Sequence, residues 1–244
     1  AAAAAEVAAA MGAEEEEGEG GEEDLVLELL ELLDEVPERG ARVSAEDAAD
    51  VSQIVSELEE EGSPAGPDWH PLSLEPAPAR RLLQRRPPLE TRHLSDDLPG
   101  AWQLRYTTSK AFHRNGGLTG YAADFAAVET PQLTMKIERR AEAGYRLLSF
   151  VEPVSLREGS IFSLLGGLAG VDAVTADCSW SVGSAGQLLV RADRLSAGGR
   201  NWEPADKQAK ALRVLSACTP VFLDDSLLVL RAQLEGVLFV FEKL

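Results

Sequence analysis

The spacing of apolar residues divides the chain into a helical part and a β-rich part. Within residues 25–36 (LVLELLELLDEV), leucine and valine recur every three or four positions with glutamates opposite, which predicts an amphipathic helix. The sequence PERG at 37–40 ends this helix. Ser44 then offers an N-cap with Asp47 at the third helical position, and a second amphipathic helix runs to Gly62. We expect the two helices to form an αα-hairpin that packs on the rest of the chain.

A membrane-surface location is the alternative interpretation of these helices. Their polar faces are acidic rather than rich in Lys and Arg, so anionic lipid would repel them. The alternative is therefore the weaker one.

From Trp102 onward the apolar period becomes two. Trp102, Leu104 and Tyr106 fall on one face of a predicted strand, and residues 133–137 repeat the pattern. Further alternating or apolar runs occupy residues 145–151, 174–182, 187–194, 212–217, 226–232 and 236–242. Many short strands without long helices between them predict an antiparallel barrel or sandwich, with about seven to nine strands.

Two segments of biased composition flank the helical hairpin. Residues 1–24 are Ala, Glu and Gly with little to bury, which predicts an acidic disordered tail that serves either for interaction or as a solvated end. Residues 63–95 are rich in proline and predict an extended linker. The linker contains the basic sequence RRLLQRR, whose candidate docking residues are Arg80, Arg81, Arg85 and Arg86. They face either anionic lipid or an acidic protein surface, or they pair with the acidic helices of the same chain.

Charge and cysteine content narrow the class of protein. The formal net charge of -18 argues against nucleic acid as a partner, because phosphate contacts need clustered Lys and Arg. Cys178 and Cys218 are too few for a disulfide-built fold and suit a reducing compartment, although one bridge between them is compatible with the sequence. No apolar run reaches the length of a transmembrane helix. The first residues resemble neither a signal peptide nor a transit peptide, so we expect any targeting segment to have been removed.

The usual catalytic arrangements are absent from the sequence. His70, His93 and His113 have no metal-ligand spacing, and no CxxC pair, G-x-S-x-G elbow or phosphate-binding loop is present. Asp224 and Asp225 are adjacent carboxylates, for which a turn role is the stronger interpretation. We therefore expect a protein that is not an enzyme and has no metal site.

Two stretches of the β-rich part carry a family resemblance. Residues 100–109 read GAWQLRYTTS, and residues 219–244 contain an aromatic-Leu-Asp-Asp turn, a strand ending in Arg, a Gly-containing turn and a Phe-Val strand. They resemble the first strand and the closing hairpin of the plastid lipid-associated proteins, also called fibrillins or plastoglobulins. The predicted helices are also similar to those of this family, which has a Leu-rich helix, an Arg-Gly turn and a second helix ending in Leu-Glu. Residues 155–211 match only in strand-like character, and the linker is longer than in the family.

The resemblance implies a mainly β fold, with a lipocalin-like antiparallel β-barrel at residues 96–244 and the helical hairpin at 25–62 before it (α+β overall). The first and last strands should lie together where the barrel closes. It also implies a chloroplast protein, peripheral to the thylakoid membrane or the plastoglobule, that binds or sequesters apolar molecules. A carotenoid, chlorophyll, quinone or lipid is the kind of bound molecule to expect.

The same resemblance suggests roles for four residues of the barrel. Trp102 would close one end, with Arg231 over its indole, and Tyr106 and Phe239 belong to the same set of ligand or barrel-closure residues. The alternative is that these residues simply complete the core.

A further candidate lies in SIFSLLGGLAGVDAV, residues 160–174. It has more apolar residues than an ordinary exposed loop, namely Ile161, Phe162, Leu164, Leu165 and Leu168. The segment is either a loop at the barrel mouth that touches a ligand, a membrane or a partner, or a buried helix that plugs one end.

A second function remains open: a structural or assembly subunit that docks on a photosystem or light-harvesting complex. The long linker, the acidic helices and the Arg cluster favour it. An open barrel interior would favour the binding protein, whereas an interior filled by its own side chains would favour the docking subunit.

Overall fold

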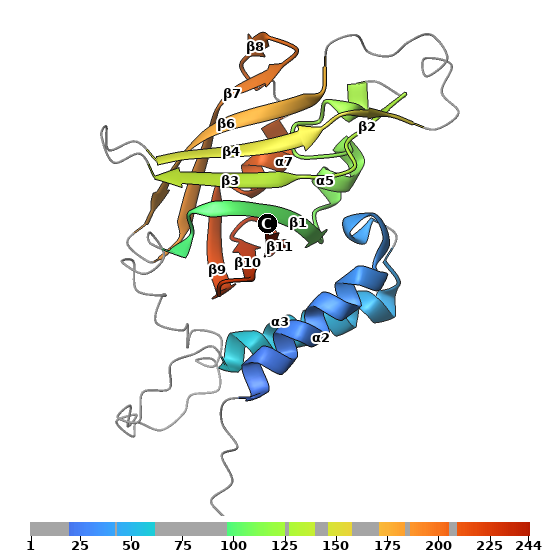
Figure 1. The fold of residues 1–244 in the computed structure, drawn as a ribbon, viewed down its shortest axis with the longest axis vertical. Coiled ribbons are helices and arrows are strands. Elements are labelled where there is room, and N and C mark those ends of the chain that lie inside the picture. The colour runs from blue at the N-terminus through green and yellow to red at the C-terminus, as the bar shows by residue number, and fades with distance from the viewer. Residues whose placement is uncertain are drawn as a thin grey trace, which may run out of the picture.

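The fold is an antiparallel β-barrel with a helical hairpin against its outer wall (Figure 1). The computed structural model describes residues 20–41, 43–61, 97–124, 127–139, 146–157, 171–183, 186–204 and 209–244. The predicted class, a mainly β lipocalin-like barrel preceded by two helices, is confirmed.

The main sheet closes on itself. Its nine strands follow the order β6-β4-β3-β1-β11-β10-β9-β7-β8, and an additional β6–β7 pairing leaves β8 outside a ring of eight. The strands of the ring are β1 (Gly100–Thr107), β3 (Thr134–Arg139), β4 (Arg146–Pro153), β6 (Ala173–Val182), β7 (Leu188–Ala197), β9 (Ala217–Leu223), β10 (Leu227–Ala232) and β11 (Leu238–Lys243). Strand β8 (Arg200–Trp202) continues from β7 in a hairpin, and β2 (Val128–Glu129) pairs separately with β5 (Ser155–Leu156). The barrel therefore has no free edge between β6 and β7.

The two stretches that carry the family resemblance lie side by side, as expected. Strand β1 pairs with β11 from Trp102 opposite Lys243 to Thr107 opposite Phe239. The first strand of the barrel is thus held by the last one.

One predicted strand is wrong. Residues 212–217 were expected to be extended, but helix α7 (Ala209–Val214) covers the first of them and β9 begins only at Ala217. Ala211, Val214 and Leu215 are buried at helical spacing in the barrel core. A short apolar run has no period of its own, so its sequence does not distinguish a strand from a buried helix.

A short helix that the periodicity did not indicate follows β1. Helix α5 (Lys110–Asn115) begins at the N-cap Ser109, whose hydroxyl oxygen accepts a hydrogen bond from Phe112 N. Gly116 ends it in the left-handed conformation, with φ 63°. This helix places Phe112 in the barrel core.

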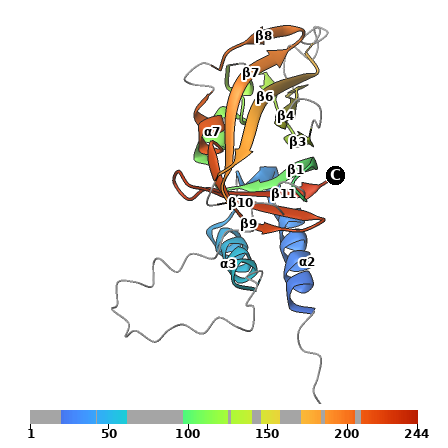
Figure 2. The ribbon, with the colours of Figure 1, turned by 90° about the vertical axis from the view of Figure 1, so that its left-hand side faces the viewer.

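The hairpin packs on the barrel as predicted. Helix α2 (Gly20–Glu35), the 3-10 turn η1 (Pro37–Gly40) and helix α3 (Ala45–Glu61) lie against the side formed by β9, β10 and β11 (Figure 2). Helix α2 begins at Gly20 rather than at Leu25, so the expected tail is shorter. The remaining tail and the linker at 63–95 lie outside the described residues.

The hairpin gives the barrel wall a second core. Its members come from both helices and from the outward faces of four strands: Val26, Leu29, Leu33, Val36, Val51, Ile54, Val55, Leu58, Tyr106, Val221, Phe222, Leu227, Val229, Leu238 and Val240. On β10, Leu228 and Leu230 face the interior while Leu227 and Val229 face the helices, and all four are at most 1% exposed. This part of the wall is buried on both faces.

Candidate functional site

The barrel interior is lined and largely filled by aromatic and aliphatic side chains. Trp102, Phe112, Phe150, Phe239 and Phe241 are each 0–1% exposed and belong to one cluster. The rings of Phe239 and Phe241 are stacked, with centroids 6.4 Å apart. A side chain with no exposed surface has no water-sized space beside it, so the interior around these described residues is packed rather than open.

The interior is less completely covered on one side, between β7 and α7. Strand β7 pairs with β9 through Leu188–Cys218 and Leu189–Ala217, and Val190 N donates one more hydrogen bond to Ser216 O at 3.0 Å. Beyond that point α7 takes the place of a strand beside β7. Val190, Ala192 and Trp202 pack against the core but are only half-buried. Trp202 belongs to β8, opposite Leu195, and its ring centroid lies 6.5 Å from that of Tyr121. We refer to Val190, Ala192 and α7 as the β7–α7 seam.

Trp102 is a core residue at one end of the barrel. Its indole N–H donates to Leu98 O at 2.9 Å, and Lys243 Nζ lies 5.2 Å from the ring centroid. Trp102 and Lys243 are opposite each other on β1 and β11. The cation over this indole is therefore Lys243, and the expected Arg231 contact is wrong.

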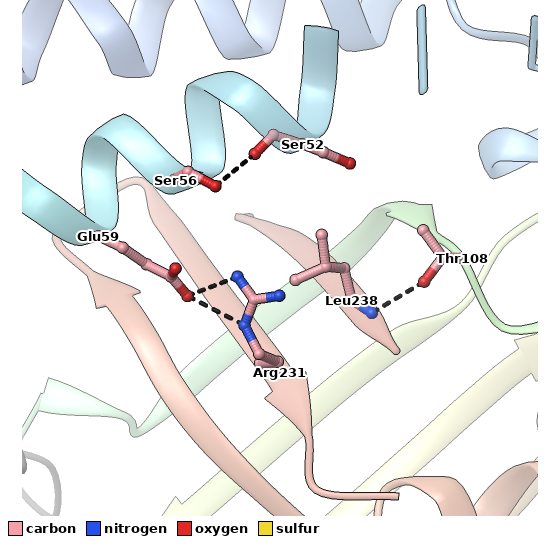
Figure 3. Close-up of polar contacts among 6 residues, drawn as sticks. All are labelled: Ser52, Ser56, Glu59, Thr108, Arg231 and Leu238. Atoms are coloured by element: carbon pink, nitrogen blue, oxygen red, sulfur yellow. Dashed lines mark hydrogen bonds and ion pairs between the residues drawn. The ribbon is translucent and has the colours of Figure 1, made fainter. Parts of the chain in front are cut away.

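Arg231 faces outward, toward the hairpin. It is paired in the sheet with Leu238, near the far end of β1 from Trp102, so it cannot reach the indole. Its Nε and Nη2 donate to Glu59 Oε1 of α3 at 3.0 and 2.6 Å (Figure 3). The two side chains are 37% and 26% exposed. Arg231 thus fixes α3 to the barrel wall.

Figure 3 also shows the hydrogen bonds of two neighbouring hydroxyl groups, those of Ser56 and Thr108. Ser56 Oγ donates to Ser52 O at 2.8 Å within α3, and Thr108 Oγ1 accepts from Leu238 N at 3.0 Å. These hydroxyl groups satisfy the backbone of the helix and of the strand, so the close-up shows a structural contact between α3 and the barrel.

Tyr106 also points away from the interior, contrary to the expected common face with Trp102 and Leu104. The pairing of β1 with β11 shifts between Leu104 and Tyr106, which is a β-bulge. One extra residue reverses the side-chain alternation, so Arg105 and Tyr106 both face outward. The ring packs in the helical core over Gly40, and burial raises the pKa of the phenol. Of the four proposed barrel-closure residues, Trp102 and Phe239 face the interior.

A buried carboxylate lies at the other end of the barrel. Glu152, near the end of β4, has no exposed surface. Its carboxylate accepts hydrogen bonds from Leu118 N, from Thr119 N at 3.1 Å and from Thr119 Oγ1. Burial raises the pKa of this carboxyl, while the bonds from Thr119 and Leu118 and the charge of Arg39 act in the opposite direction.

The hairpin turn reaches the same end of the barrel. Arg39 and Gly40 both have positive φ, 59° and 92°. Arg39 Nη2 donates to Thr130 O at 2.7 Å, and its guanidinium carbon lies 5.0 Å from the centroid of the Phe112 ring. Thr130 Oγ1 in turn donates to Gly116 O. We refer to Arg39, Thr119, Thr130 and Glu152 as the polar end of the barrel.

The sequence contains a signal for Glu152 that was missed. Leu148, Phe150 and Glu152 share one face of β4 at a period of two, so a single carboxylate continues an otherwise apolar inner face. A charged residue in that position is rarely buried without partners. Its partners, however, come from a different part of the chain.

The remaining candidates for catalytic or metal-binding roles, His113, Asp224 and the two cysteines, have structural roles or are buried. His113 Nε2 lies 2.9 Å from Thr107 O, and Asp224 Oδ1 accepts hydrogen bonds from Ser226 N and Leu227 N, which confirms the turn role of Asp224. Cys178 and Cys218 are free and buried, and burial raises the pKa of each thiol to about 12.

Two other observations concern metals and membranes. Within the described ranges, no group of three or more His, Cys, Asp and Glu side chains could hold a metal ion. In that same part of the chain, no helix combines the length and apolarity needed to cross a bilayer.

Two sets of candidates lie outside the described residues. They are the docking arginines Arg80, Arg81, Arg85 and Arg86, and the apolar segment with Ile161, Phe162, Leu164, Leu165 and Leu168. Their proposed roles stay predictions.

Comparisons of the chain with family models, curated proteins and solved structures find no match. The resemblance to plastid lipid-associated proteins therefore stays a prediction, based on residues 100–109 and 219–244.

Proposed function

We propose that this chain is a non-enzymatic, fibrillin-like plastid protein that binds an apolar molecule at the surface of the thylakoid membrane or the plastoglobule. The observation that supports the proposal is a closed antiparallel barrel to whose interior every strand of the ring contributes buried apolar side chains. An eight-stranded barrel is either filled by its own side chains or holds one small ligand, and apolar walls suit a ligand of apolar chemistry. A carotenoid, a quinone or a lipid has the required chemistry.

The ligand is expected at the β7–α7 seam rather than in a preformed central cavity. The large aromatic side chains fill the interior near β1 and β11, whereas Val190 and Ala192 at the seam are only half-buried. Since α7 replaces a strand there, it can move without breaking a sheet ladder. Burial of these side chains by a ligand is favourable by about 25 cal/mol per Å² of apolar surface.

The test uses the full chain, purified from plastid extract and extracted with organic solvent, followed by binding of added β-carotene, plastoquinone or galactolipid. We expect an extracted pigment, quinone or lipid, and saturable binding of at least one probe. The variant Val190→Trp should weaken binding because it fills the seam. The matched control is Leu189→Trp, which alters the outward-facing neighbour on the same strand. Absence of any extracted molecule together with no binding of the three probes would refute the proposal.

The second candidate function is a subunit that docks on a photosystem or light-harvesting complex. The packed interior favours it, because a barrel filled by its own side chains acts as a rigid scaffold. Deleting the first 95 residues is not a clean test, since it would uncover Leu227, Val229 and Val240.

Charge reversal of Arg80, Arg81, Arg85 and Arg86 to Glu in the full chain is the sharper experiment for this candidate. The control reverses Arg157 and Arg200, two exposed arginines of the barrel. Loss of co-sedimentation with isolated thylakoid complexes in the first variant alone would support docking through the linker. Equal co-sedimentation of both variants would argue against it.

A further inference from the structure

A groove lies between the two helices of the hairpin, which run side by side (Figure 1). Its volume is about 300 Å³, and its lining comes from α2 and α3 alone. On α2, Glu31 and Glu35 line the groove from the other side of the helix than Leu29 and Leu33, which pack in the helical core. The groove is therefore open to solvent rather than to the barrel. Its lining residues are Glu28, Glu31, Leu32, Glu35, Asp50 and Ile54.

The groove has an apolar floor and an acidic rim. Leu32 of α2 is half-buried and Ile54 of α3 is buried, and these two side chains form the floor. The four carboxylates around them are exposed and form the rim. Glu28, Glu31 and Glu35 are three and four positions apart on one helix, a spacing at which like charges repel each other. A partner with positive charges around an apolar centre relieves this repulsion and covers the floor.

Two other acidic side chains of the hairpin are paired with the barrel. Asp34 of α2 pairs with Arg105 of β1, and Glu59 of α3 pairs with Arg231 of β10. Within the described ranges, by contrast, none of the four carboxylates of the rim takes part in an ion pair. Any positively charged partner of the rim therefore comes from outside the described residues.

We propose that the groove is the docking site of the chain's own basic segment, residues 80–86 (RRLLQRR). Leu82 and Leu83 cover the apolar floor, and the four arginines of the segment pair with the four carboxylates of the rim. The two surfaces match in kind and in number, because two leucines meet two apolar side chains and four positive charges meet four negative ones. Anionic lipid does not fit this groove, since the acidic rim repels it.

The basic segment can reach the groove from the end of α3, which is at Glu61. Residues 62–79 connect the two and can span up to about 60 Å when fully extended. Asp50 lies only about 17 Å back along α3 from Glu61, at the rise of an α-helix. Because the segment is attached to the hairpin, its effective concentration at the groove is on the order of millimolar. A contact that is weak between separate molecules is therefore sufficient.

This docking affects how the linker meets other proteins. Arginines that are held at the rim are not available to an acidic surface of another protein, so the groove and such a surface compete for residues 80–86. The docking is independent of a ligand in the barrel, because the groove and the interior core share no residue.

Hydrogen exchange of the full chain at low salt measures the docking. The amides of residues 80–86 should be protected in the parent chain. Glu31→Lys together with Asp50→Lys should reduce this protection by about tenfold, because two attractive contacts become repulsive. The matched control is Glu23→Lys together with Glu60→Lys, which changes the net charge equally at exposed positions of the same helices outside the groove. The control should leave the protection unchanged.

A charge swap gives a second test. Arg81→Glu together with Arg85→Glu should also reduce the protection of residues 80–86, and combining this variant with Glu31→Lys and Asp50→Lys should restore it. Dilution distinguishes the chain's own segment from that of a second copy, because docking within one chain does not depend on protein concentration. Exchange in the parent chain as fast as in the free peptide RRLLQRR would overturn the proposal. Protection that rises with protein concentration, or that the charge swap does not restore, would do the same.

Discussion

Replacing Gly40 with alanine tests the contact between the hairpin turn and the barrel wall. Gly40 has φ +92°, and a Cβ on it would lie 2.8 Å from Tyr106 Cε2, 2.9 Å from Tyr106 Cδ2 and 3.1 Å from Thr107 O. The left-handed backbone costs an alanine about 1–2 kcal/mol. Forcing a methyl group against a fully buried ring and a backbone carbonyl adds about 1–3 kcal/mol. The expected loss in the free energy of unfolding is therefore about 2–5 kcal/mol.

Gly199 provides the matched control for this prediction. It has φ +76°, and a Cβ there meets nothing within 4 Å, so Gly199→Ala should cost only the conformational part, about 1–2 kcal/mol. Urea unfolding followed by circular dichroism measures both variants. In a Tyr106→Ala background the excess cost of Gly40→Ala should decrease, because the ring is gone and only the closer approach to Thr107 O remains. Equal losses for Gly40→Ala and Gly199→Ala would refute the reasoning.

Two further predictions concern contacts of the wall and the core. Arg231→Ala and Glu59→Gln, made singly and together, should show a coupling of about 0.5–1 kcal/mol in the free energy of unfolding. The coupling should decrease with added salt, because the pair is partly exposed. Zero coupling in urea unfolding at low salt would contradict the attachment of α3 to the barrel through this ion pair. The thiols of Cys178 and Cys218 should resist iodoacetamide in the folded protein near neutral pH and react after unfolding, because burial raises the pKa of each to about 12. Mass spectrometry of the labelled chain checks this, and rapid labelling of either thiol in the native state would contradict the burial.

Periodicity in the sequence was enough to predict the elements that bury one face. The leucine spacing of residues 25–36 and the alternation that begins at Trp102 led to the hairpin and to most strands of the ring. Residues 212–217 were assigned wrongly because a short apolar run fits a strand and a buried helix equally well.

The partners of individual residues were harder to predict, for a physical reason. The bulge after Leu104 turns Tyr106 from the interior to the helices, and nothing in the alternation of β1 itself indicates an extra residue. Arg231 was expected at Trp102, but the register of β10 and β11 places it beside Glu59, 172 positions earlier in the chain. Glu152 finds its partners in a segment more than thirty positions away. Such contacts depend on how distant segments are arranged in the fold, and the pattern of neighbouring residues in the sequence does not reveal this arrangement.

The two-sided burial of β10 and β11 has a consequence for how the chain reaches its fold. Strand β11 completes the interior by pairing with β1 and completes the helical core through Leu238 and Val240. During synthesis, the first strand can already pair with β3, but its second partner and part of the surface that covers the hairpin are absent until β11 has emerged from the ribosome. Contacts of this kind, such as that of Thr107 with Leu238 across 131 positions, slow folding because long loops must close first. Until then the apolar faces of the helices are only partly covered, so the incomplete chain exposes apolar surface that the finished fold buries.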